Sequence, residues 1–178
     1  MRVIAGTLRG KTFHELHKHR MHPMSEKIRG ALFNVLGDIE GLTFLDAFAG
    51  SGALSFEAVS RGAKSSIAIE KDRAAHSLID KNVEELRLKK KVHVVRANTA
   101  GWSIHNAEKK FDIVLLDPPF SDMQPNLLTK LVKRHVKVRG LAILSAPMDF
   151  EAIDFENTEL AVRKKYGDAQ LAFYRKVK

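Results

Sequence analysis

Residues 113–120 read IVLLDPPF, a stretch in which an apolar run ends at an acid, two prolines and an aromatic ring. An apolar run of this length predicts a strand buried on both faces, as in a parallel sheet flanked by helices. Pro118 and Pro119 cannot continue a sheet ladder, because proline fixes φ and lacks a backbone donor. The pattern predicts a stiff, acceptor-rich corner at the carboxyl end of a strand, where ligands bind in open α/β sheets. A plain exit from strand to loop is the alternative.

A glycine loop precedes this corner in the chain. In DAFAGSGALSFEA, residues 46–58, Gly50 and Gly52 would let backbone amides approach a ligand closely. A P-loop needs a lysine and a hydroxyl residue after its second glycine, and Ala53 and Leu54 are neither. ATP hydrolysis is therefore not expected.

Two acidic residues at predicted strand ends limit which ligands the glycine loop could bind. Asp46 would repel a pyrophosphate and attract a cationic amine, whereas Glu70 is placed to accept hydrogen bonds from ribose hydroxyls. S-adenosylmethionine combines a ribose, an adenine and a cationic amino acid portion without phosphates. The sequence therefore predicts S-adenosylmethionine as the cofactor, and the alternative is a glycine turn needed only for close helix packing.

Strand and helix patterns alternate along the chain, which predicts an α/β, Rossmann-like fold with helices on both faces of a mostly parallel sheet. A tight turn at Gly167 and Asp168 makes the last two strands antiparallel, so the seven-stranded sheet is expected to be mixed at one edge. The predicted strands cover 42–48, 65–70, 92–97, 111–117, 141–146, 159–166 and 170–177. The predicted helices begin at Ser25, cover 53–61, follow Asp72, cover 99–107, and carry a stripe of Leu127, Leu128, Leu131 and Val132.

Composition limits the class of protein. A chain of 178 residues with 44% hydrophobic residues predicts a single domain, 1–178, made of a basic segment, 1–24, and a catalytic fold, 25–178. The absence of cysteine excludes thiolate chemistry and cysteine-based zinc sites. No stretch has the roughly 20 apolar residues of a membrane span and no signal-peptide core is present, so a cytoplasmic protein without a membrane partner is expected.

Positive charge is concentrated at the start of the chain. The formal net charge is +9, and residues 1–29 hold seven basic and two acidic residues. Such a cluster favours a polyanionic partner, and a solvated arm that aids solubility is the alternative. The four histidines between His14 and His22 match no zinc pattern, so no metal is expected. The residues predicted to contact RNA are Arg2, Arg9, Lys11, Arg20, Lys27 and Arg29.

The combined motifs resemble a known family. DAFAGSG, an acid at the second strand and DPPF at the fourth are similar to class I methyltransferases that act on an exocyclic amine. With MRVIAG, IRGALFNVL and the pair Ala97-Asn98, they resemble the RsmD-type 16S ribosomal RNA guanine-N2 methyltransferases over residues 1–174. The chain departs from that family's Arg-Pro-Thr at His22-Pro23-Met24 and from its glutamate at Gly30. If that arginine holds RNA, Arg20, Lys27 or Arg29 would have to replace it.

The resemblance implies a role for each motif. Asp46 would lie near the methionine portion of the cofactor, Glu70 on the ribose and Asn98 on the adenine edge, although an Asn after a strand is often only a turn residue. The implied cofactor-binding set is Asp46, Phe48, Gly50, Ser51, Gly52, Glu70, Lys71, Asn98 and Asp117.

The same resemblance explains the opening corner. The N2 amine of guanine is a poor nucleophile because its lone pair is delocalised into the ring, and two hydrogen-bond acceptors would favour its pyramidal form. Asp117 and the Pro118 carbonyl would supply these acceptors, Pro119 would stiffen the corner, and Phe120 would stack on the flipped base. A packing role is the alternative for Phe120.

Two other functions fit part of the pattern. One is methylation of adenine N6 in DNA or RNA, which poses the same chemical problem. The other is a non-catalytic RNA-binding factor for ribosome assembly. The favoured partner is ribosomal RNA or the small ribosomal subunit, and a monomer is expected.

Overall fold

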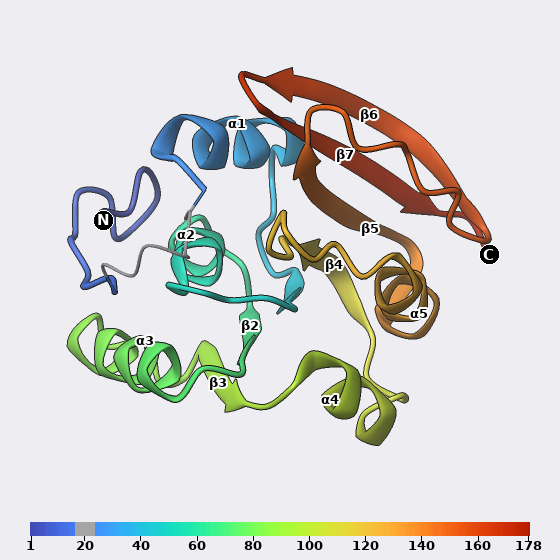
Figure 1. Cartoon of the computed structure of the whole chain (residues 1–178). Coiled ribbons are helices and arrows are strands. Elements are labelled where there is room, and N and C mark those ends of the chain that lie inside the picture. Colours follow the sequence, from blue (N-terminus) through green and yellow to red (C-terminus); the bar gives the residue numbers. More distant parts are fainter. Residues whose placement is uncertain (17–23) are drawn as a thin grey trace. The chain divides into compact units, whose positions relative to one another are not determined.

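The computed structural model describes residues 1–16 and 24–178 (Figure 1). The chain divides into two compact units, Met1–Thr99 and Ala100–Lys178. Among the described residues, no helix is both long and apolar enough to cross a membrane.

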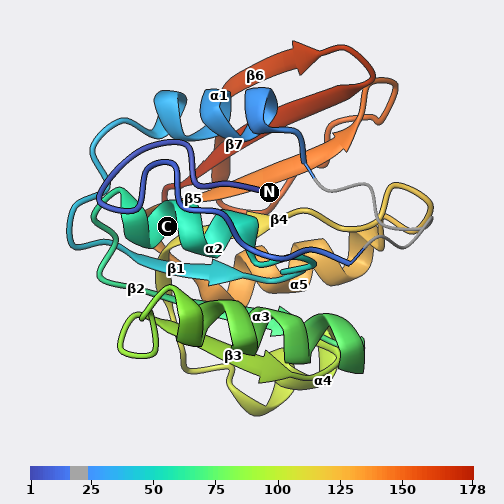
Figure 2. The ribbon, with the colours of Figure 1, turned by 90° about the vertical axis from the view of Figure 1, so that its left-hand side faces the viewer.

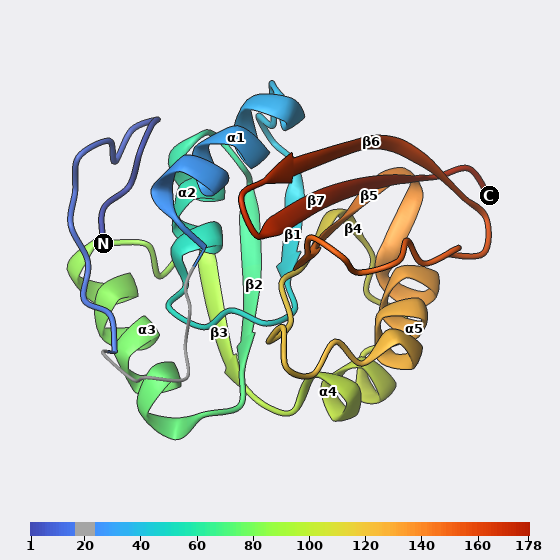
Figure 3. The ribbon, with the colours of Figure 1, turned by 45° about the horizontal axis from the view of Figure 1, so that its top comes forward.

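The first unit is built around three parallel strands. β2 pairs with β1 on one side and with β3 on the other, and α2 and α3 lie on one face of these strands (Figure 3). The elements are α1 (Glu26–Leu36), β1 (Thr43–Asp46), α2 (Ala53–Ser60), β2 (Ser65–Glu70), α3 (Arg73–Glu85) and β3 (Val92–Arg96).

Helix boundaries in this unit follow local chemistry. The Ser25 hydroxyl accepts a hydrogen bond from the Ile28 amide and begins α1, which ends at Gly37 with φ of 69°. The Asp72 carboxylate likewise accepts from the Ala75 amide at 2.9 Å and begins α3. Both helix starts were expected from the sequence.

The first 13 residues fold back onto α2. Arg2 and Thr12 form an antiparallel bridge, and the Glu57 carboxylate of α2 accepts hydrogen bonds from the amides of Ile4 at 2.9 Å and Ala5 at 3.0 Å. Phe13 packs edge-on against Phe56 with ring centroids 5.1 Å apart. The start of the chain is therefore attached to the fold by a buried carboxylate.

The second unit contains most of α4 and four further strands. β4 pairs in parallel with β5, whereas β7 is antiparallel to both β5 and β6, so β6 lies outermost (Figure 2). The elements are α4 (Thr99–His105), β4 (Phe111–Leu116), α5 (Pro125–His135), β5 (Val136–Pro147), β6 (Thr158–Tyr166) and β7 (Ala169–Lys176). The predicted α/β fold, mostly parallel with an antiparallel pair at its end, is confirmed.

Candidate active site

The glycine loop after β1 has a conformation that requires glycine. Gly50 and Gly52 have φ of 56° and 79°, a region that side chains other than glycine rarely adopt. A Cβ on Gly52 would lie 2.9 Å from the Phe56 ring and 3.1 Å from a methyl of Ile79. The backbone conformation therefore favours glycine at both positions, and at Gly52 there is also no room for a side chain.

Glu70, at the end of β2, holds the glycine loop. One of its carboxylate oxygens accepts a hydrogen bond from the Gly50 amide at 2.9 Å, and the other accepts from the Asp72 amide at 2.7 Å. A carboxylate offers about four acceptor positions, so these two bonds leave capacity for two hydroxyl groups. The half-buried Glu70 can thus fix the loop and still receive a ribose diol.

Asp46, at the end of β1, is buried. Its side chain is only 1% exposed, and one carboxylate oxygen accepts a hydrogen bond from the Ser55 hydroxyl at 2.8 Å. Ser55 in turn lies 2.9 Å from the Ser66 hydroxyl of β2. These contacts link the end of β1 to α2 and β2, and the place of Asp46 beside the methionine portion of the cofactor stays a prediction.

The other predicted cofactor residues of this unit lie on the loops that follow its strands. Phe48 and Ser51 are half-buried, whereas Lys71 and Asn98 are exposed. The hydroxyl of Thr99, next to Asn98, donates to the Ala47 carbonyl at 2.7 Å and so ties the loop after β3 to the loop after β1. Sequence reasoning missed Ser55 and Thr99, because a hydroxyl residue inside a helix carries no signal of its partner.

In the second unit, Asp117 follows β4 as predicted. The register that pairs Leu116 with Leu144 brings Asp117 beside Ser145 of β5. Burial raises the pKa of Asp117 to about 6, and a hydrogen bond with Ser145 opposes that rise. The carboxylate is therefore mostly ionised at neutral pH but titrates in mild acid.

The residues after Asp117 form a closed turn with an exposed ring. Pro118 is buried and Pro119 exposed, and the Asp122 amide donates to the Pro119 carbonyl at 2.8 Å. Phe120 is 43% exposed, which is unusual for a large apolar side chain. Its ring is thus not a core residue and is available to stack on a flat ligand.

The residues predicted to contact RNA are exposed, outside the described residues or, in the case of Arg29, buried. Arg2, Arg9, Lys11 and Lys27 are exposed, and Arg2 pairs with Glu26 at 3.0 Å. Arg20 lies outside the described residues.

Arg29 corrects the sequence prediction, because its side chain is fully buried. It donates to the Arg2 carbonyl at 2.6 Å and lies 3.6 Å from the Glu57 carboxylate. It therefore cannot reach an RNA phosphate. Its place on the inner face of α1 makes it the counter-ion of a buried acid.

Within residues 1–16 and 24–178, no group of three or more histidine, aspartate or glutamate side chains is arranged to hold a metal ion.

Four features together define a Rossmann-like class I methyltransferase. They are the alternating strands and helices, the glycine loop after β1, the acid that ends β2 and the Asp-Pro-Pro-Phe sequence after β4. The chain matches, over residues 1–175, the family model described as conserved hypothetical protein 95. It belongs to this family, that of the RsmD-type rRNA methyltransferases.

Individual relatives agree with this assignment. YlbH of Bacillus subtilis is 31% identical over 184 residues, which are 99% of this chain and 99% of the relative. Ribosomal RNA small subunit methyltransferase D of Haemophilus influenzae is 29% identical over 180 residues, 98% of this chain and 93% of the relative. The solved structure of yhhF from Escherichia coli, 28% identical, superposes with a TM-score of 0.86 over 99% of this chain and 98% of that one.

Proposed function

We propose that this chain transfers a methyl group from S-adenosylmethionine to the N2 amine of a guanine in 16S ribosomal RNA. Family membership supports methyl transfer to ribosomal RNA. The observation that carries the choice of an exocyclic amine is the corner after β4, where an ionisable carboxylate and a proline carbonyl precede an exposed aromatic ring. These are the groups that a flat base with a weakly nucleophilic amine needs.

The first unit would bind the cofactor. The remaining acceptor capacity of Glu70 suits the two ribose hydroxyls, and Asn98 suits the adenine edge. The backbone of Gly50 and Gly52 allows the amino acid portion to approach without meeting a side chain. S-adenosylmethionine, when bound, supplies an electrophilic methyl group on a sulfonium.

The second unit would prepare the nucleophile. The two N–H groups of the amine would each donate a hydrogen bond, one to Asp117 and one to the Pro118 carbonyl, which would localise the nitrogen lone pair and direct it toward the methyl group. The bound sulfonium would supply the methyl group and would be left as a neutral thioether, while Asp117 and the Pro118 carbonyl would hold the amine that receives it. The resulting ammonium is acidic and loses its proton to water, so Asp117 serves mainly as an aimed acceptor.

Phe120 would hold the base after it leaves the RNA stack. Flipping a nucleotide costs a few kcal/mol, and stacking on an aromatic side chain returns ~1–3 kcal/mol per base. Because Phe120 is exposed, this stacking requires no rearrangement of the core.

Product identification tests the proposal. The purified chain is incubated with methyl-labelled S-adenosylmethionine and, separately, with unmethylated small-subunit particles, naked 16S ribosomal RNA and duplex DNA. Nucleoside mass spectrometry should find N2-methylguanosine in a ribosomal substrate. Formation of N6-methyladenosine would favour the adenine methyltransferase instead.

A cofactor titration distinguishes the proposed enzyme from a non-catalytic RNA-binding assembly factor. Calorimetry with S-adenosylmethionine should give saturable one-to-one binding. Absence of binding, together with absence of methyl transfer, would favour an RNA-binding assembly factor and reject the enzyme.

A further inference from the structure

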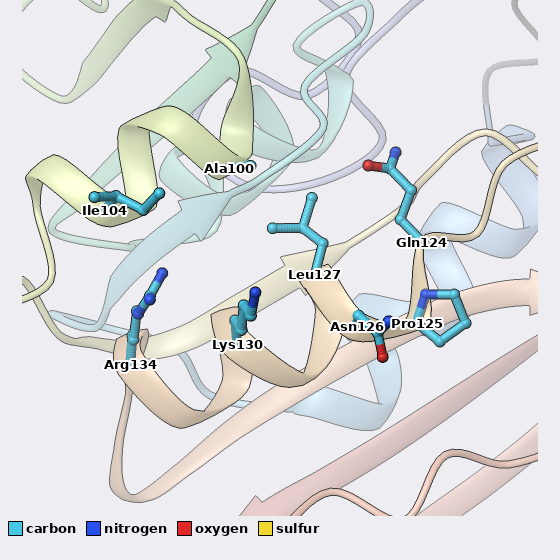
Figure 4. A pocket seen from close by; sticks show the side chains of 8 residues that line it. All are labelled: Ala100, Ile104, Gln124, Pro125, Asn126, Leu127, Lys130 and Arg134. Carbon is cyan, nitrogen blue, oxygen red and sulfur yellow. The ribbon is translucent and has the colours of Figure 1, made fainter.

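The second unit contains a hollow of about 350 Å³ between α4 and α5 (Figure 4). It is separate from the Asp-Pro-Pro-Phe residues, none of which lines it. A volume near 300 Å³ is the lower end of what small-molecule sites in proteins enclose. The side chains that characterise the hollow are Ile104, Gln124, Asn126, Leu127, Lys130 and Arg134.

The lining combines three kinds of group. Ile104 of α4 is 62% exposed, so an apolar surface faces solvent beside Leu127 of α5. Gln124 and Asn126 contribute amide donors and acceptors. Lys130 and Arg134, one turn apart on α5, contribute two cations.

The charged side chains that line this hollow are both positive among the described residues. None of the described residues that line it is acidic. Lys130 forms no ion pair within the described parts of the chain. Arg134 donates to the neutral hydroxyl of Ser103 at 3.2 Å. A ligand that matches the hollow therefore carries negative charge beside a flat or apolar portion, which describes a nucleotide.

We propose that the α4–α5 hollow binds one nucleotide that flanks the target in the RNA strand. Its base contacts Ile104 and Leu127, the amides of Gln124 and Asn126 meet the base edge, and Lys130 and Arg134 meet its phosphate. This proposal rests on the proposed function, because it takes RNA as the substrate.

Chain connectivity limits how far this nucleotide lies from the target. Gln124, at the start of the hollow, is four residues after Phe120. Four residues span at most about 14 Å, so the hollow begins close to the corner that receives the target base. A single extended strand can therefore place one nucleotide at Phe120 and a near neighbour in the hollow.

Reversing the charge of Lys130 tests whether this side chain contacts an RNA phosphate. In the whole chain, Lys130→Glu should weaken binding of a fluorescein-labelled 16S ribosomal RNA transcript about fivefold more than Lys164→Glu and lower the salt slope by about 1. Lys164 is the matched control, because it is an exposed lysine of β6 in the same unit. Equal weakening by both variants would overturn the proposal, because it would indicate a general effect of net charge.

A single introduced thiol gives a second test. The natural chain has no cysteine, so Ile104→Cys and the control Val138→Cys each carry one exposed sulfur. The RNA transcript should slow alkylation of the Ile104→Cys thiol by N-ethylmaleimide at least severalfold and leave the Val138→Cys thiol unaffected. Unchanged alkylation of Ile104→Cys at saturating RNA would contradict a nucleotide in the hollow.

Cofactor measurements on the same variants distinguish the two proposals. S-adenosylmethionine should bind the Lys130→Glu variant within twofold of the natural chain and should not protect the Ile104→Cys thiol. Loss of cofactor affinity would indicate that the hollow binds the cofactor. That result would overturn the proposal of a nucleotide in the hollow but would leave the proposed methyltransferase function intact. A natural chain that neither binds nor methylates RNA would reject the proposed function as well.

Discussion

Asp117 is subject to two opposing demands. Partial burial disfavours its charge and raises its pKa to about 6, whereas the proposed chemistry needs the charged form to accept hydrogen bonds from an amine. Burial of the charged carboxylate therefore destabilises the fold, whereas the same charge is needed for activity. Substitutions that remove this charge should raise stability and lower activity.

The stability of the Asp117→Asn variant tests whether the charged carboxylate destabilises the fold. Because the folded pKa lies above the usual 3.8, the natural protein loses stability as pH rises through 6, and below 3.8 the group is neutral in both states. The substitution should increase the free energy of unfolding at pH 8 by up to about 3 kcal/mol and have little effect below pH 4. Urea unfolding at both pH values measures this. A gain of equal size at both pH values, or one matched by the exposed Asp122→Asn control, would contradict it.

Ser145 should set the pH range of activity. Its hydrogen bond lowers the pKa of Asp117, so Ser145→Ala should raise that pKa and shift the acid limb of the rate profile to higher pH. Methyl transfer measured between pH 5 and 8 would reveal the shift. The exposed Ser121, which lies in the same loop, provides the control Ser121→Ala, and an unshifted limb in Ser145→Ala would argue against the contact.

Phe120 should contribute to substrate use and not to stability. Phe120→Ala should lower kcat/KM for ribosomal RNA by the ~1–3 kcal/mol of one stacked base, and Phe120→Tyr should restore most of it. Thermal unfolding should change little, because the ring is 43% exposed. Leu160→Ala, at a side chain 46% exposed on β6, is the matched control. Loss of activity in both variants would point to a general defect.

At the scale of elements, a buried ion pair joins the N-terminal segment to α1 and α2. Glu57 and Arg29 are both fully buried, and Glu57 also accepts from Arg61 at 2.8 Å and from two backbone amides. Removing one member of such a pair costs more than the pair itself contributes, because the remaining charge stays buried.

Variants of this pair should be strongly non-additive. Glu57→Gln should lower the free energy of unfolding by about 3–5 kcal/mol, and adding Arg29→Met should recover part of the loss. A double-mutant cycle in urea measures the coupling. Glu26→Gln, which removes the exposed partner of Arg2, should cost no more than about 1 kcal/mol. Additive losses would mean that the pair is not coupled.

Local patterns predicted the elements well where one residue type decides the structure. The strand at residues 65–70 and the helix starts at Ser25 and Asp72 agree with the sequence analysis. β5 begins at Val136, earlier than the predicted 141, because it follows α5 without a loop.

The direction of charged side chains was not predictable from the same patterns. Arg29 was expected on the surface, yet it is buried against the Arg2 carbonyl and Glu57, which are distant in sequence. Glu57 gave only a weak signal, an acid in a helix whose other residues are small or apolar. Long-range pairing determines such positions, and a single sequence does not reveal it.

At the scale of the whole molecule, the proposed roles divide along the chain. The predicted cofactor residues other than Asp117 belong to the first unit, whereas the Asp-Pro-Pro-Phe corner and the α4–α5 hollow belong to the second. The net charge of +9 includes exposed cations in each unit, among them Arg9, Lys11 and Lys130. Damage to the corner should therefore stop methyl transfer without loosening the cofactor.

Single-turnover methyl transfer by the Asp117→Ala variant tests this account most directly. With unmethylated small-subunit particles and labelled S-adenosylmethionine in excess, we expect the rate to fall by at least about a hundredfold. Calorimetry on the same preparation should find the cofactor affinity within a few-fold of the natural chain. A variant that transfers methyl groups at the natural rate would contradict the role assigned to Asp117 and the chemistry built on it.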